Sequence, residues 1–152
     1  MNSEVAFMRR AIALAEQAAS VGEVPVGALV VKDGKVVGEG FNQPITSCDP
    51  TGHAEIVAMR HASAVLENYR LSDCDLYVTI EPCTMCVGAM IHARIGKIIF
   101  GAAEPRAGAL ESQLRLMDMD HYNHKIAWQG GVLAEECGAI ISDFFRRKRE
   151  KS

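Results

Sequence analysis

Four side chains in two short motifs have the types and spacing of a catalytic zinc site. His53 and Glu55 stand two residues apart, and Cys83 and Cys86 form a C-x-x-C pair further along the chain. One imidazole and two thiolates are ligands that zinc prefers, and three protein ligands leave the fourth tetrahedral position open to water. Zinc lowers the pKa of such a water to about 7, and Glu55 would serve as the acid/base that moves protons. The residues therefore predict zinc-dependent chemistry on water.

A C-x-x-C pair alone also fits a thioredoxin-like redox centre or half of a four-cysteine structural zinc site. The chain holds five cysteines but no second C-x-x-C, and no early strand leads into Cys83 as in the first βα turn of a thioredoxin pattern. Pro82 suits the first turn of a helix, whose positive end favours the thiolate form of Cys83 and Cys86. We therefore expect these two cysteines and His53 to bind one zinc ion.

These ligands must be positioned by the ends of regular elements. Periodicity and turn signals predict helices over residues 4–21, 53–66, from 82 onward and 134–148, and strands over residues 24–31, 35–41, 75–80, 97–100 and 125–129.

The order of these elements predicts the layers of the fold. Asp33-Gly34 predicts a two-residue hairpin, and the later strands alternate with helices and are therefore expected to be parallel. We predict an α/β fold, a three-layer α/β/α sandwich with a mixed central sheet. Helices that follow adjacent parallel strands begin at the same sheet edge, so His53 can meet the two cysteines there. Glu55 can lean toward the same ion from the first helical turn.

Composition excludes several classes of protein. The 152 residues are 49% hydrophobic without a composition break, which predicts a single domain over 1–152. No apolar run has membrane-spanning length and the start lacks a signal-peptide pattern, so we expect a cytoplasmic protein without a membrane partner. A net charge of -3 and a pI near 5.9 argue against a surface coated with nucleic-acid-binding charge. The basic run over residues 146–151 has two interpretations. It forms a local cationic patch, or its charges complement the dipole at the C-terminal end of a helix.

The pattern His53-x-Glu55 followed by Pro82-Cys83-x-x-Cys86 resembles the zinc-dependent cytidine/adenosine deaminase superfamily. Over nearly the whole chain the sequence is similar to the bacterial tRNA-specific adenosine deaminase family. The segments that carry this similarity are residues 24–28, 38–42, 49–55, 68–71, 76–86, 88–92 and 143–146.

This resemblance implies a cytidine deaminase-like fold, one Zn²⁺ per subunit and a homodimer. It also implies hydrolytic deamination of adenosine to inosine at the wobble position of a tRNA, with the anticodon arm as partner. Glu55 would protonate the ring nitrogen and later deliver a proton to departing ammonia. The residues that the resemblance places at the substrate are Asn42, Val24, Pro25, Ala54, Glu104 and Asn123.

The stretch after Gly101 departs from the family pattern. Glu104 and Arg106 keep the expected types of charge, but Glu111 places an acid where a small residue is common. For Asn42, the similarity to a nucleoside-contacting position competes with an ordinary role as a turn-capping residue after a strand.

Two other functions share parts of this pattern. A deaminase of a free nucleobase or nucleoside, such as guanine or cytosine, would carry every zinc-site residue. A zinc-stabilised RNA-binding module would exclude water from the metal and would not need Glu55. Turnover of free bases without turnover of a stem-loop favours the first alternative, and RNA binding without release of ammonia favours the second.

Overall fold

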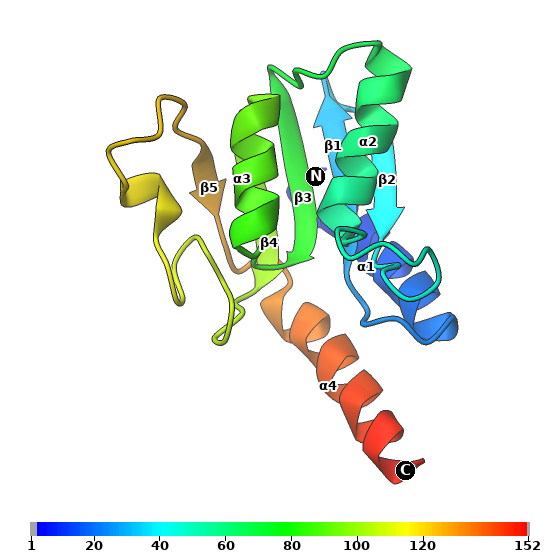
Figure 1. Ribbon diagram of the computed structural model, residues 1–152. Helices are drawn as coiled ribbons and strands as arrows, with labels where there is room; N and C mark the ends of the chain where they lie inside the picture. Colours follow the sequence, from blue (N-terminus) through cyan, green and yellow to red (C-terminus); the bar gives the residue numbers. More distant parts are fainter. Residues whose placement is uncertain (1–2, 152) are drawn as a thin grey trace.

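The computed structural model describes residues 3–151, which form a five-stranded sheet flanked by helices (Figure 1). The elements are α1 (Ser3–Ser20), β1 (Gly27–Lys32), β2 (Lys35–Phe41), α2 (Ala54–Leu66), β3 (Cys74–Ile80), α3 (Thr84–Ala93), β4 (Lys97–Ala102), the short 3-10 helix η1 (Leu116–Asp118), β5 (Ala127–Gln129) and α4 (Ala134–Glu150). The strand order is β2-β1-β3-β4-β5. Strand β1 is antiparallel to both of its neighbours, whereas β3, β4 and β5 are mutually parallel. The predicted mixed sheet is confirmed.

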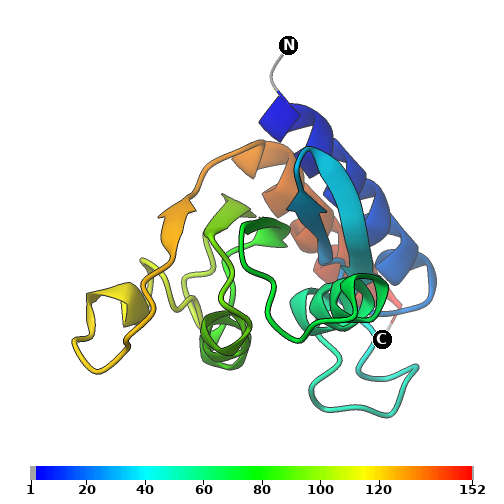
Figure 2. The same cartoon turned by 90° about the horizontal axis from the view of Figure 1, so that it is seen from above.

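Helices cover both faces of this sheet, as the predicted three-layer sandwich requires. Figure 2 shows α2 and α3 on one side of the sheet and α1 and α4 on the other. Side chains alternate along β3 with the period of two expected for a strand: Leu76 and Val78 are buried beneath α2 and α3, and Tyr77 is buried on the opposite face. Both faces of the central strands are therefore apolar.

Two glycines of β2 let α2 lie unusually close to the sheet. A Cβ atom on Gly40 would lie 2.5 Å from the carbonyl oxygen of Ala54 and 2.6 Å from the nitrogen of Ala58. Gly38 faces the backbone of Ala58 and the side chain of Ala62 in the same way. The glycines are thus structural, and they fix the height of α2 above β2.

Helices α2 and α3 begin at the same edge of the sheet, but the strand order behind this differs from the prediction. The strands that precede them, β2 and β3, are not adjacent, because β1 lies between them. Two successive antiparallel pairings nevertheless give β2 and β3 the same direction. Their helices therefore start at one edge of the sheet, as predicted, although the assumed adjacency was wrong.

Two predicted boundaries near the potential metal ligands also shift. Strand β1 begins at Gly27 rather than at Val24, so Val24 and Pro25 lie in the connection from α1. Helix α3 begins at Thr84 with Cys83 as its N-cap, so Pro82 precedes the helix instead of occupying its first turn. Within residues 3–151, no helix has the length and apolar character needed to cross a bilayer.

Substitution of Gly40 by Ala tests the close approach of α2. The added methyl group has no room against the α2 backbone, so we expect Gly40→Ala to lower the free energy of unfolding by about 1–3 kcal/mol. Urea unfolding followed by circular dichroism measures the change. Gly138→Ala is the matched control, because a Cβ there meets the Ala102 side chain at an ordinary 3.8 Å within helix α4. Equal stability of Gly40→Ala and the wild type would contradict this account.

Candidate active site

Three potential metal ligands meet where α2 and α3 begin. The Nδ1 atom of His53 lies 3.6 Å from the Sγ atom of Cys83 and 3.5 Å from the Sγ atom of Cys86. The three ligand atoms all lie within 4.8 Å of one another. In a tetrahedral zinc site with ordinary bond lengths, a nitrogen ligand and a sulfur ligand lie about 3.6 Å apart. The residues therefore fit a zinc ion, and the structure brings the three predicted ligands together.

Helix N-termini place these ligands. His53 is the N-cap of α2 and Cys83 is the N-cap of α3, both with extended backbone, and Cys86 lies in the first turn of α3. The side chain of Asn42 strengthens the first of these ends, because its Oδ1 accepts a 3.0 Å hydrogen bond from the Ala54 nitrogen. This hydrogen bond spans 12 residues, so Asn42 caps the start of α2 rather than the turn directly after β2 that the sequence suggested.

Hydrogen bonds among Cys83, Cys86 and His53 shift the pKa values of all three side chains. A hydrogen bond from Cys86, together with one from His53, lowers the pKa of Cys83 to about 4 despite partial burial. Donation to Cys83 and burial raise the pKa of Cys86 above its ordinary range. The hydrogen bond to Cys83 also raises the pKa of His53. A bound divalent cation would displace the remaining thiol proton, because cysteine binds metal as thiolate.

Glu55 is a buried carboxyl group beside these ligands. Glu55 is only 3% exposed. Burial raises its pKa to about 7, although a hydrogen bond from its own backbone N–H acts to lower it. A carboxyl group with a pKa near neutrality can both accept and release a proton under physiological conditions. The predicted acid/base residue therefore lies next to the predicted metal ligands.

Most of the predicted substrate residues lie around the same edge. Pro25 and Ala54 are buried and Val24 is partly buried. The Asn42 nitrogen donates to the carbonyl oxygen of Val26, which places the connection that holds Val24 and Pro25 beside Asn42. These residues can therefore form one wall next to the α2 N-terminus.

Glu104 and Asn123 lie in different surroundings. The Glu104 nitrogen donates to the side chain of Glu81, two residues before Cys83, so Glu104 is close to the start of α3. Asn123 is exposed and precedes His124, whose Nε2 donates to the carbonyl oxygen of Ile95 beyond the C-terminal end of α3. The structure therefore does not bring Asn123 to the other site residues.

Two buried carboxylates near the site received no role from the sequence. Glu23 is 1% exposed and accepts hydrogen bonds from the Ile45 and Thr46 nitrogens and the Thr46 hydroxyl, which ties down the loop after β2. Glu81 is 2% exposed. Burial acts to raise the pKa of Glu81, but hydrogen bonds from Glu111, Ser112 and Glu104 outweigh burial and lower it. An acidic residue directly after an apolar strand, as at Glu81, is the signal that could have drawn attention to it.

Loss of any one ligand should remove the metal. We expect His53→Ala and Cys86→Ala to reduce zinc content by at least about tenfold, because two remaining ligands cannot hold the ion tightly. Mass spectrometry of metals after desalting measures the content. Cys48→Ser is the matched control and should keep its zinc, because Cys48 is exposed and lies in the loop after β2. Full zinc occupancy in Cys86→Ala would show that the ligand set is wrongly assigned.

Comparison with known proteins supports the same chemistry. The family model of the MafB19-like deaminases matches residues 1–149. The chain is 47% identical to the tRNA-specific adenosine deaminase of Haemophilus influenzae over 95% of this chain and 84% of that protein. It is 38% identical to the Bacillus subtilis protein of the same name over 99% of this chain and 94% of that protein.

The structural comparison agrees with these relatives. A solved structure from a study of A-to-I editing by tRNA:A34 deaminases at the wobble position of transfer RNA superposes with a TM-score of 0.87. It shares 39% sequence identity and covers 89% of this chain and 98% of its own. The chain therefore belongs to the MafB19-like deaminase family and to the tRNA-specific adenosine deaminases.

Proposed function

We propose that the protein hydrolyses adenosine to inosine and ammonia at the wobble position of a tRNA anticodon, using one zinc ion per subunit. The observation that carries this proposal is the meeting of His53, Cys83 and Cys86 beside the buried Glu55. The names of the relatives supply the substrate class, since the tRNA-specific deaminases match this chain over nearly its whole length.

His53, Cys83 and Cys86 would hold the zinc ion. A zinc ion bound there supplies a water molecule of lowered pKa for attack on the purine ring. Three protein ligands leave one coordination position for this purpose, which distinguishes a catalytic site from a structural one.

Glu55 moves the protons of the reaction. Its carboxylate accepts a proton from water and donates it to the ring nitrogen next to the reacting carbon. It then takes the second proton of that water from the hydroxyl group now bonded to the carbon and delivers it to the departing amino group. Water and adenosine are consumed, and inosine and ammonia are formed. Burial raises the pKa of Glu55, which favours the uptake of a proton by this carboxylate during the reaction.

The target base would lie against the start of α2. We assign the side-chain amide nitrogen of Asn42 to the nucleoside, because its Oδ1 already accepts from Ala54. Val24, Pro25 and Ala54 would supply apolar contacts to the ring, and Glu104 would border the opening from the other side. A loop base of RNA can be extruded into such a pocket more readily than a paired base.

Local positive charge supports the anticodon arm as partner despite the acidic net charge. The last turn of α4 carries Arg147, Lys148 and Arg149. Figure 1 shows that α4 extends beyond the sheet edge at which α2 and α3 begin. Cations at this position suit the phosphates of a stem that continues away from the reacting base. Asn123 would contact RNA only away from the base pocket.

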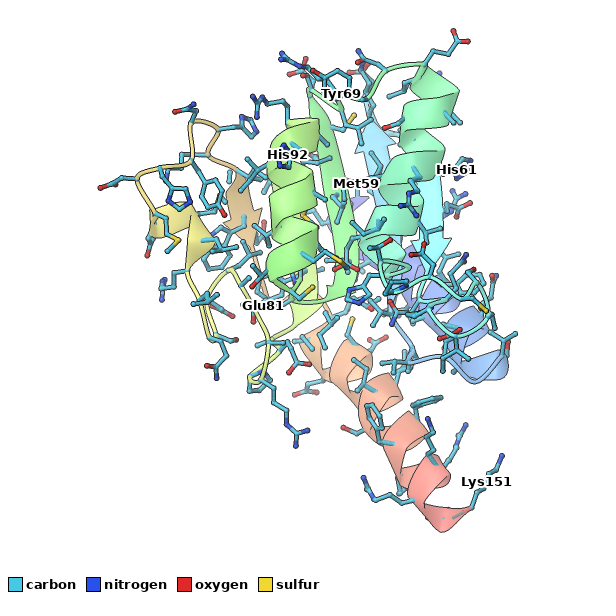
Figure 3. All side chains as sticks on the ribbon, in the orientation of Figure 1. Met59, His61, Tyr69, Glu81, His92 and Lys151 are labelled. Atoms are coloured by element: carbon cyan, nitrogen blue, oxygen red, sulfur yellow. The ribbon has the colours of Figure 1, made fainter. Side chains whose placement is uncertain are left out.

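A homodimer would cover the groove between α2 and α3. This groove encloses about 530 Å³ and is lined largely by apolar side chains, among them Ile56, Met59, Met85 and Ala89. The side chain of Tyr69 at its rim is 70% exposed, and Figure 3 shows Tyr69, Met59 and His92 around this region. A second copy of the chain is the occupant that we assign to this surface, in agreement with the homodimer that the family resemblance implies.

Turnover of a short RNA tests the activity. We expect zinc-loaded wild-type protein to convert the wobble adenosine of an anticodon stem-loop to inosine with release of ammonia. Glu55→Ala should keep fold and zinc but lose about 10²–10⁴-fold in kcat, because the proton carrier is absent. Nucleoside analysis of digested RNA measures inosine.

Controls separate the alternatives. Free adenine, guanine, cytosine and their nucleosides are incubated in parallel, and a stem-loop with guanosine at the wobble position should give no product. Turnover of free bases without turnover of the stem-loop would replace our proposal by a free-base deaminase. Undiminished turnover in Glu55→Ala would contradict the assigned mechanism.

The oligomeric state tests whether the groove between α2 and α3 is the dimer interface. We expect the wild type to sediment as a dimer and Ala89→Arg to sediment as a monomer, because the new charge would be buried without a partner. Ala6→Arg on the exposed face of α1 is the matched control and should remain dimeric. A wild-type monomer at micromolar concentration, or an Ala89→Arg dimer, would contradict this interface.

A further inference from the structure

The carboxylate of Glu81 gathers five hydrogen bonds from one loop. Its Oε1 accepts from the Glu104 nitrogen and the Ser112 hydroxyl, and its Oε2 accepts from the nitrogens of Leu110, Glu111 and Ser112. The three distances to Oε2 lie between 2.8 and 3.1 Å. Three successive backbone N–H groups that converge on one oxygen form a binding site for an anion.

This arrangement needs a carboxylate. All five partners are donors, and an ionised carboxylate offers about four acceptor positions and no hydrogen. A glutamine at this position would replace one of the two carboxylate oxygens by an NH₂ group. That group would then face donors instead of accepting hydrogen bonds from them. Gly108 also lies against the carboxylate, where any Cβ would collide with it. The loop over residues 104–112 is therefore built around this side chain.

The same loop is attached to the backbone that carries the metal ligands. The Ala109 nitrogen donates 2.9 Å to the carbonyl oxygen of Pro82, and Glu81 itself donates to Ala102 at the end of β4. Figure 3 shows Glu81 at the end of α3 where the helix begins. Cys83 follows Glu81 by two residues. The side chain that binds the loop is therefore almost adjacent in sequence to a potential metal ligand.

The loop forms one wall of a hollow beside Cys83. This hollow encloses about 370 Å³ and is lined by Cys83, Thr84, Met85, Arg106, Ala107, Gln113 and Leu114. The side chain of Arg106 is exposed, and its backbone nitrogen donates a hydrogen bond to the Glu104 side chain within the same loop. The position of this guanidinium relative to Cys83 therefore depends on how the loop is held.

We propose that Glu81 is a positioning residue whose buried carboxylate holds the 104–112 loop so that Arg106 binds an RNA phosphate next to the target nucleotide. This assignment rests on the proposed function, since it names a phosphate group of the same RNA substrate. Arginine suits a phosphate because its planar donors form charge-assisted hydrogen bonds. Glu81 acts through the loop and does not touch the substrate.

A double-mutant cycle on RNA affinity tests the role. The Kd of a fluorescently labelled anticodon stem-loop is measured by anisotropy for the wild type, Glu81→Gln, Arg106→Ala and the double variant, all zinc-loaded. We expect Arg106→Ala to weaken binding about tenfold, which corresponds to one charge-assisted contact. Glu81→Gln should weaken binding by a similar factor, and Arg106→Ala should add less than about twofold in that background, because coupled residues are not additive.

A matched buried carboxylate controls for general destabilisation. Glu23→Gln removes a comparable acceptor from a different loop, so its effect and that of Arg106→Ala should be additive. If Glu81→Gln does not fold, Gly108→Ala displaces the same loop while it keeps the carboxylate, and it takes the place of Glu81→Gln in the cycle.

Two results would overturn the proposal. One is an unchanged Kd in folded Glu81→Gln, and the other is the same penalty for Arg106→Ala with and without Glu81. Inosine formation by the wild type is measured in the same samples. Absence of wild-type turnover speaks against the deaminase function, whereas the affinity cycle decides the role of Glu81 independently of turnover.

Discussion

The direction of two strands that do not touch decides whether this molecule has an active site at all. Strands β2 and β3 each lead toward a helix whose N-cap is a potential metal ligand, His53 in one case and Cys83 in the other. Both must end at the same sheet edge, and they do so because β1 pairs antiparallel with each of them. The hairpin at Asp33-Gly34 therefore serves the site as much as the fold. Without that reversal, the imidazole and the thiols would lie at opposite ends of the sheet.

Three buried glutamates near this edge illustrate how the surroundings decide the role of one chemical group. Glu23 and Glu81 are each met by several N–H and O–H donors, which compensate for the water lost on burial. Glu55 has fewer such donors, so burial dominates and its pKa rises to about 7. The first two carboxylates are thereby suited to holding loops, and the third is suited to exchanging a proton.

Much of the candidate site could be predicted from residue type and spacing. His53, Cys83 and Cys86 are chemically distinctive, and a helix start restricts where such side chains can lie. The three-layer fold follows from hydrophobic periodicity and the order of elements, and it is confirmed. Strand β1 begins later than the sequence predicts, because Val24 and Val26 have strand-forming side chains but the backbone becomes a strand only at Gly27. The role of Glu81 could not be predicted, since its donors lie 23 to 31 residues away and most are backbone groups common to all residue types.

The dependence of the 104–112 loop on Glu81 also limits how such an enzyme can be redesigned. A loop copied from a relative with a different substrate would bring its own backbone conformation, but it would meet a fixed anion below it. A graft that does not present N–H groups at the positions of Leu110, Glu111 and Ser112 would leave that charge buried without compensation. Changes of specificity by loop exchange should therefore treat Glu81, Gly108 and Ser112 as one inseparable unit.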